Sequence, residues 1–209
     1  MGFNMSWVFV DNIDQATLYK ALDLAPTDVS PDRHDLGTSD VPLAGGHVKS
    51  GWCAVFAKYS MVMDALMGTS PPRLERIPSQ SRCIACVVLE HAMVSYAGVW
   101  EGGRPVWEIR HDGGDHLEAS GDLPADFARI RDIANDKQRS SPRGAWSVDY
   151  LFDIPPDTVA TLTDYRHDRT LAPDFFTELR TLVPVNGNVL TRLSQPPKWW
   201  QLTRSIRYE

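Results

Sequence analysis

Between residues 83 and 119 the chain alternates short β-like runs with glycine turns, and this pattern restricts the fold more than any other part of the sequence. The runs are rich in β-branched and aromatic residues, which favour strands, and they span 83–89, 93–100, 106–110 and 116–119. Turns at Gly102-Gly103 and Gly113-Gly114 separate the later runs, because glycine tolerates the positive φ angles of tight turns. Consecutive strands joined by short turns predict an antiparallel meander.

The residues before this region predict two further strands and two short helices. Residues 6–10 and 51–57 are the β-like runs, and Asp11-Asn12 ends the first of them. Asp14 is the expected N-cap of the first helix, and residues 60–67 fit the second, with Gly68 just past its end at the usual C-cap position. Residues 25–46 contain three prolines and three glycines without a sustained period, which predicts a long surface loop.

The residues after the meander predict helices that cover the sheet. Asp122 is the expected cap of a helix whose apolar face consists of Leu123, Phe127, Ile130 and Ala134. Residues 148–154 predict a short strand, a helix is expected to begin at Pro155, and residues 175–182 fit a helix or a strand. The sequence therefore predicts an α+β fold, an antiparallel β-meander sheet with helices packed on one face.

The length of the chain favours one domain over two. The 209 residues exceed the usual size of a domain without reaching two, and 43% are hydrophobic and 23% charged, as in ordinary globular proteins. We expect a single α+β domain over residues 1–184. Residues 185–209 form the expected C-terminal tail, which could pack on the domain.

Charge and hydropathy restrict the environment and the partners. The chain lacks a run of 18 apolar residues and a basic-then-apolar start, which predicts a cytoplasmic protein that does not bind a membrane. A formal net charge of -6 argues against nucleic-acid binding, which usually requires a basic face. Nothing in the pattern indicates an oligomeric state.

The charge is distributed unevenly along the chain. Residues 1–45 hold seven aspartates against two basic residues, whereas the last thirty residues are basic and contain two adjacent tryptophans. Such asymmetry is typical of an interaction surface or, equally, of a solvated face. The candidate binding residues are Asp28, Asp32, Asp35, Asp40, Trp199 and Trp200.

The tripeptide Arg-His-Asp occurs three times, and two copies supply candidate catalytic residues. A carboxylate that orients an imidazole creates a general base. The candidates are His111, Asp112, His167 and Asp168. Neighbours on a strand point to opposite faces, so a catalytic pair would join two different copies. The simpler interpretation is that each copy ends an element and its aspartate bonds the backbone of the next turn.

Motifs for metals and cofactors are weak in this chain. Cys83 and Cys86 have CxxC spacing, but they lie in an apolar run without a second pair, so buried packing is favoured over a zinc or redox site. Phosphate-binding loops, nucleophile elbows and dinucleotide-binding glycine patterns are missing from the sequence. We therefore predict no cofactor and no metal.

Short motifs occur over most of residues 6–182, namely Gly51-Trp52, Glu90-His91, Val106-Trp107, His111-Asp112, Val148-Asp149, Phe152-Asp153-Ile154-Pro155 and Arg166-His167-Asp168, among others. In these motifs the sequence resembles a group of small bacterial cytoplasmic proteins to which no activity has been assigned. The resemblance implies no catalytic residue.

Two classes of function follow from these features. The leading hypothesis is a cytoplasmic protein-binding module, an immunity-type protein that neutralises a partner toxin, because acidic surfaces attract basic partners. The alternative is a small hydrolase or transferase that uses the histidine and aspartate candidates.

Overall fold

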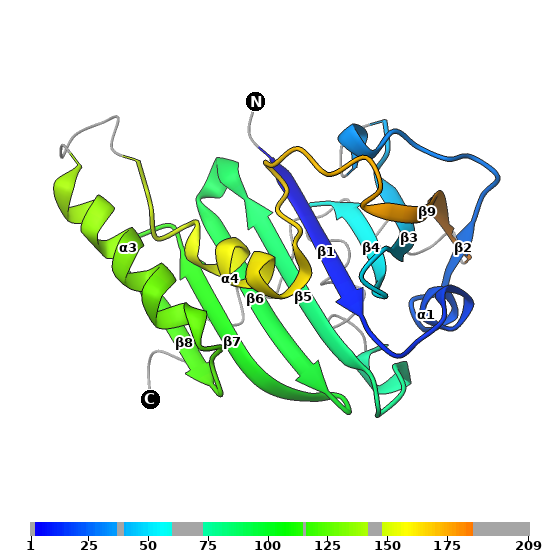
Figure 1. Ribbon diagram of the computed structural model, residues 1–209, viewed down its shortest axis with the longest axis horizontal. Helices are drawn as coiled ribbons and strands as arrows, with labels where there is room; N and C mark the ends of the chain where they lie inside the picture. The colour runs from blue at the N-terminus through cyan, green and yellow to red at the C-terminus, as the bar shows by residue number, and fades with distance from the viewer. Residues whose placement is uncertain (1–2, 37–39, 60–72, 115, 142–147, 186–209) are drawn as a thin grey trace.

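The computed structural model shows one nine-stranded antiparallel sheet with helices on it (Figure 1). It describes residues 3–36, 40–59, 73–114, 116–141 and 148–185. The strands are β1 Asn4–Val10, β2 Leu24–Pro26, β3 Leu43–Val48, β4 Cys53–Lys58, β5 Arg82–Leu89, β6 Val94–Glu101, β7 Arg104–Asp112, β8 Leu117–Gly121 and β9 Phe176–Pro184. The helices are α1 Gln15–Ala21, α3 Asp126–Ser140 and α4 Ile154–Thr163, with short 3-10 turns at Arg33–Asp35, Arg73–Arg76 and Glu90–Ala92. The predicted α+β class is confirmed.

The order of strands in the sheet is β2-β9-β3-β4-β1-β5-β6-β7-β8. Strands β5 to β8 are consecutive neighbours and form the predicted meander, in which the β6–β7 turn has positive φ at Gly102 and Gly103. The first strand lies in the centre, where Trp7 is opposite Phe56 of β4 and Cys86 of β5. The last described strand, β9, lies between β2 and β3.

The two faces of the sheet carry separate apolar clusters because side chains alternate along each strand. Helices α3 and α4 cover one face, where Trp7 and Phe9 of β1 pack with Phe127, Ile130 and Ile154 of the helices (Figure 1). The residues between them in β1 point to the other face, where the short helix α1 contributes to the core. Both faces of β1 are therefore buried, which explains its continuous apolar sequence.

Three local predictions were wrong. The segment 25–46 is not all loop, because it contains the end of β2 and most of β3. Residues 148–154 form a turn and the start of α4 rather than a strand, and α3 begins at Asp126 without a cap from Asp122. Residues 60–67 lie outside the described residues, as does the tail from residue 186, so those predictions are untested.

Candidate functional site

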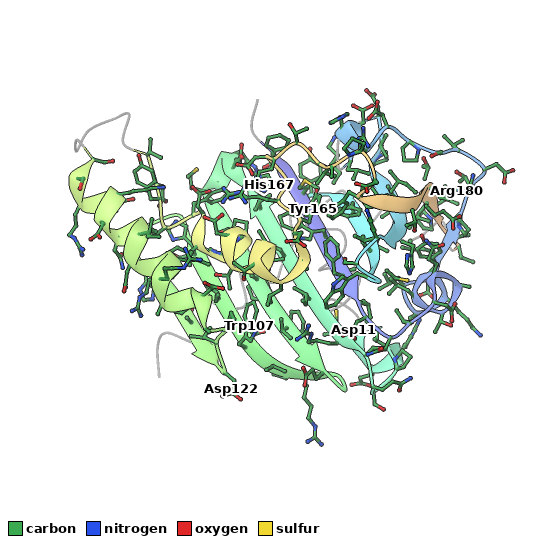
Figure 2. All side chains as sticks on the ribbon, viewed as in Figure 1. Asp11, Trp107, Asp122, Tyr165, His167 and Arg180 are labelled. Carbon is green, nitrogen blue, oxygen red and sulfur yellow. The ribbon has the colours of Figure 1, made fainter. Side chains whose placement is uncertain are left out.

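The acidic loop, which we define as residues 27–36, is fixed to the outer side of β9 by main-chain hydrogen bonds. The amide of Thr27 donates to the carbonyl oxygen of Thr181 at 2.9 Å, and the amide of Thr181 donates to that of Val29 at 2.8 Å. Arg180 donates to the carbonyl oxygen of Asp28 at 3.4 Å. Figure 2 shows Arg180 at this outer end of the sheet. The loop therefore has a defined position on the sheet edge.

The second half of the acidic loop is held by its own side chains. Arg33 donates to the carbonyl oxygen of Pro173 at 2.6 Å, which ties the loop to the segment before β9. The carboxylate of Asp32 accepts the amide of His34 at 2.9 Å and caps the short 3-10 turn. Leu36 forms an isolated parallel bridge with Val41. These contacts make the loop a structured lobe.

The candidate binding carboxylates lie on this lobe and beside it. Asp28, Asp32 and Asp35 belong to the acidic loop, Asp40 lies near the Leu36–Val41 bridge, and all four residues are exposed. Trp199 and Trp200 lie outside the described residues. The structure thus brings the four predicted aspartates to one region of the surface.

His111, the first candidate catalytic histidine, is a buried residue of β7. Its exposed fraction is 0%, Nδ1 lies 3.1 Å from the carbonyl oxygen of His116, and Nε2 lies 2.7 Å from a carboxylate oxygen of Asp149. Both partners are hydrogen-bond acceptors, so both ring nitrogens are engaged. The arrangement joins β7 to the turn before α4.

His167, the second candidate, lies just after α4 against the central strand. Its ring stacks on Trp7 with centroids 5.7 Å apart and meets the edge of Phe3 at 5.2 Å. Nε2 is 3.5 Å from Glu90, whereas Nδ1 is buried without a partner among the described residues. Burial holds the pKa of His167 below its ordinary value, which favours the neutral ring.

Arg166 is the centre of the densest charge cluster in the described part of the chain. It is 8% exposed and its guanidinium contacts Asp153 at 2.5 Å, Asp168 at 2.7 Å and Asp157. Arg169 also contacts Asp157, at 3.2 Å. Burial raises the pKa of Asp153 despite the attraction of Arg166. At Asp168 burial acts in the same direction, but the bond from Arg166 outweighs it and holds the pKa below its ordinary value.

The candidate catalytic residues do not form one catalytic group. His111 and the stacked ring of His167 lie on the helix-covered face, but β7 and β1 are three strand positions apart, about 14 Å. Asp112 points to the other face by strand alternation, and Asp168 is bonded to Arg166. The partners of the two histidines are instead Asp149 and Glu90.

Several important side chains were not predicted from the sequence. No sequence pattern predicts the contact of Asp149 with His111, the contact of Glu90 with His167, or the charge cluster around Arg166. The spacing of Asp153 and Asp157 was the available signal, because residues four apart share one face of a helix. Their common partner, Arg166, follows α4 in the sequence, and its side chain contacts the start of that helix. No local sequence pattern indicates this contact.

The described residues show no group of three or more metal-ligating side chains. Cys53, Cys83 and Cys86 are free and buried. Burial raises the pKa of the Cys53 thiol to about 11, with a contribution from Asp14, and raises those of Cys83 and Cys86 as well. A buried protonated thiol is a poor nucleophile.

Comparison with known proteins adds no relative. No protein-family model, no curated protein and no solved structure matches the chain. In the described residues, no helix is long and apolar enough to cross a membrane. The geometry of the site is therefore the basis for a functional proposal.

Proposed function

We propose that the protein is a cytoplasmic, immunity-type binding protein that neutralises a basic protein partner through Asp28, Asp32, Asp35 and Asp40. One observation carries the proposal, namely that these exposed carboxylates lie on and beside a lobe that the sheet edge holds in place. A fixed loop loses little conformational entropy on binding, so more of the interaction energy contributes to affinity. The negative charge attracts a basic surface and accelerates association.

The surroundings of the two histidines support binding over turnover. His111 has an acceptor at each ring nitrogen and no exposed surface, so it has no route to a substrate proton. His167 is covered by Trp7 and Phe3. A general base must reach the proton that it removes, and neither ring has that access. The hydrolase or transferase alternative therefore lacks a geometric argument.

Association kinetics test the proposal. Proteins that co-purify with the chain from its native cells are identified and prepared separately, and their binding is measured by surface plasmon resonance. Replacing the four aspartates with asparagine is expected to lower the association rate constant about tenfold at low salt. The difference shrinks as salt shortens the Debye length.

A matched control changes the charge by the same amount elsewhere. Asp122, Asp126, Asp132 and Asp136 lie on or next to α3, at the other end of the sheet (Figures 1 and 2), and their replacement by asparagine should leave the association rate within about twofold of the unmodified protein. Equal rates for both quadruple variants contradict the proposal. So does substrate turnover by the purified protein that His111→Ala or His167→Ala abolishes without unfolding the chain.

A further inference from the structure

Strand β9 has an open edge next to the acidic loop. The pairing of β2 with β9 ends at Leu182, and the loop adds main-chain bonds to Thr181 only. Main-chain groups alternate in direction along a strand, so the N–H and C=O of Leu179 point to the same side as those of Thr181, away from β3. Among the described residues, no strand lies beside Leu179 on that side.

A cleft with a volume of about 610 Å³ lies along this open edge. One wall is the acidic loop from Ser30 to His34, and the other is β9 from Phe176 to Arg180. The bonds from Arg33 to Pro173 and from Arg180 to Asp28 join the two walls at both ends. The cleft is therefore built into the fold, and its length of five β9 residues corresponds to about 16 Å of extended chain.

The charges at the cleft favour a basic occupant. Asp32 and Glu178 line it, and Asp28 and Asp35 are exposed on the acidic loop. Arg180 pairs with Glu178 at 3.4 Å, and Arg33 donates to the carbonyl oxygen of Pro173. The four carboxylates of the cleft lining and the acidic loop outnumber these two arginines, so the charge around the cleft is negative.

We propose that this cleft binds an extended basic segment of the partner protein, about five residues long, as an additional strand on β9. Main-chain hydrogen bonds to Leu179 supply affinity, and lysine or arginine side chains at alternate positions face the carboxylates. Side chains at the intervening positions lie towards Phe176. The proposal rests on the proposed function and identifies which part of the partner the site recognises.

The probe for this site is the synthetic peptide acetyl-Lys-Val-Lys-Val-Lys-amide. On ¹⁵N-labelled protein, the amide of Leu179 is expected to exchange rapidly with solvent before the peptide is added. At millimolar peptide its resonance should shift and its exchange should slow at least about tenfold, because a paired amide is protected. The same peptide with glutamate in place of lysine should have no effect.

Backbone methylation of the peptide separates strand pairing from simple charge attraction. Alternate N–H groups of an added strand point to its partner, so N-methylation should weaken binding about tenfold at alternate positions and have little effect between them. In the protein, Leu179→Pro removes both the buried leucine side chain and the backbone N–H. Leu179→Ala removes the same side chain but keeps the backbone N–H. The proline variant should lose peptide binding and the alanine variant should retain it.

Several outcomes overturn the strand proposal. These are an unchanged Leu179 resonance at millimolar peptide, equal effects of methylation at every position, or an amide already protected by the chain's own residues or a second copy. If the four-asparagine variant still slows partner association while the Leu179 results fail, the proposed function stands and only this mode of recognition is wrong. Failure of both sets of experiments removes the proposed function as well.

Discussion

Replacement of the buried Arg166 by methionine is expected to destabilise the protein more than the removal of any exposed or half-exposed charge. Methionine keeps most of the apolar stem and removes the guanidinium, so Asp153, Asp157 and Asp168 lose their shared cation. Removing one partner of a buried ion pair costs about 3–5 kcal/mol because the remaining charge is left uncompensated. The three aspartate side chains are 31–40% exposed, so water screens them partly and the lower limit applies.

The expected loss is thus about 3 kcal/mol in the free energy of unfolding at neutral pH. For a chain of this size it lowers Tm by about 6–12 °C. Arg169→Met is the matched control, because the Arg169 side chain is 63% exposed and contacts only Asp157 of the same cluster. An exposed pair of this kind contributes about 0–1 kcal/mol.

The stability difference between the unmodified protein and the Arg166 variant depends on pH, and the sign follows from the pKa shifts of the aspartates. The pKa of Asp168 is lowered, so its ionisation stabilises the fold above its ordinary pKa and that contribution is lost as the pH falls. The pKa of Asp153 is raised, so its ionisation acts in the opposite direction. Without Arg166 the pKa values of Asp153 and Asp168 rise, because Arg166 lowers both, and acidification relieves the repulsion among the carboxylates of the variant. The stability gap between the two proteins should therefore narrow below about pH 5.

Urea denaturation followed by tryptophan fluorescence measures this gap at pH 7.5 and pH 4.5. A difference below about 1 kcal/mol at the higher pH, or a gap that does not change with pH, refutes the role assigned to the cluster. An equal loss in the Arg169 variant shows that total charge, rather than burial of Arg166, determines the effect.

The thiols and His111 provide further tests. Cys53, Cys83 and Cys86 are expected to react with a disulfide reagent at pH 8 more than about a hundredfold slower than in unfolded protein, because burial keeps them protonated and covered. Rapid reaction of a folded thiol contradicts their burial. His111→Leu should lower the free energy of unfolding in urea by about 2–3 kcal/mol, because Asp149 loses its hydrogen bond to the imidazole. The affinity for the partner protein should stay unchanged. A stable variant that no longer binds the partner means that the ring has a functional role.

Strands with strong local patterns were predictable, whereas β3 was missed for a physical reason. Its sequence contains Gly45 and Gly46, and paired glycines favour a loop. In the fold, a Cβ at Gly46 would lie 2.2 Å from the carbonyl oxygen of Glu178, and one at Gly45 would lie 2.7 Å from the hydroxyl of Tyr19. These glycines allow β9 and α1 to approach the strand closely. Sequence alone does not distinguish close packing from a turn.

The exposure of the loop aspartates was predictable, because charged residues that are close together in the sequence favour the surface. Their role in binding stays a prediction. The pairing of His111 with Asp149 joins residues 38 positions apart, so it depends on the tertiary fold. Asp149 also accepts the amides of Leu151 and Phe152, which turns a segment predicted as a strand into the approach to α4. In this segment the hydrogen bonds of the Asp149 carboxylate override the local strand propensity.

The insertion of the last described strand beside β3 determines when the binding surface exists during synthesis. Strands β5 to β8 can pair as they leave the ribosome, since each contact is local in sequence. The acidic loop emerges early, but its anchors on Thr181 and Pro173 are translated about 140–150 residues later. A chain interrupted before β9 therefore carries the aspartates without their arrangement. Only a chain that has been synthesised through β9 acquires the surface that we propose for the partner, so shorter chains are not expected to compete for it.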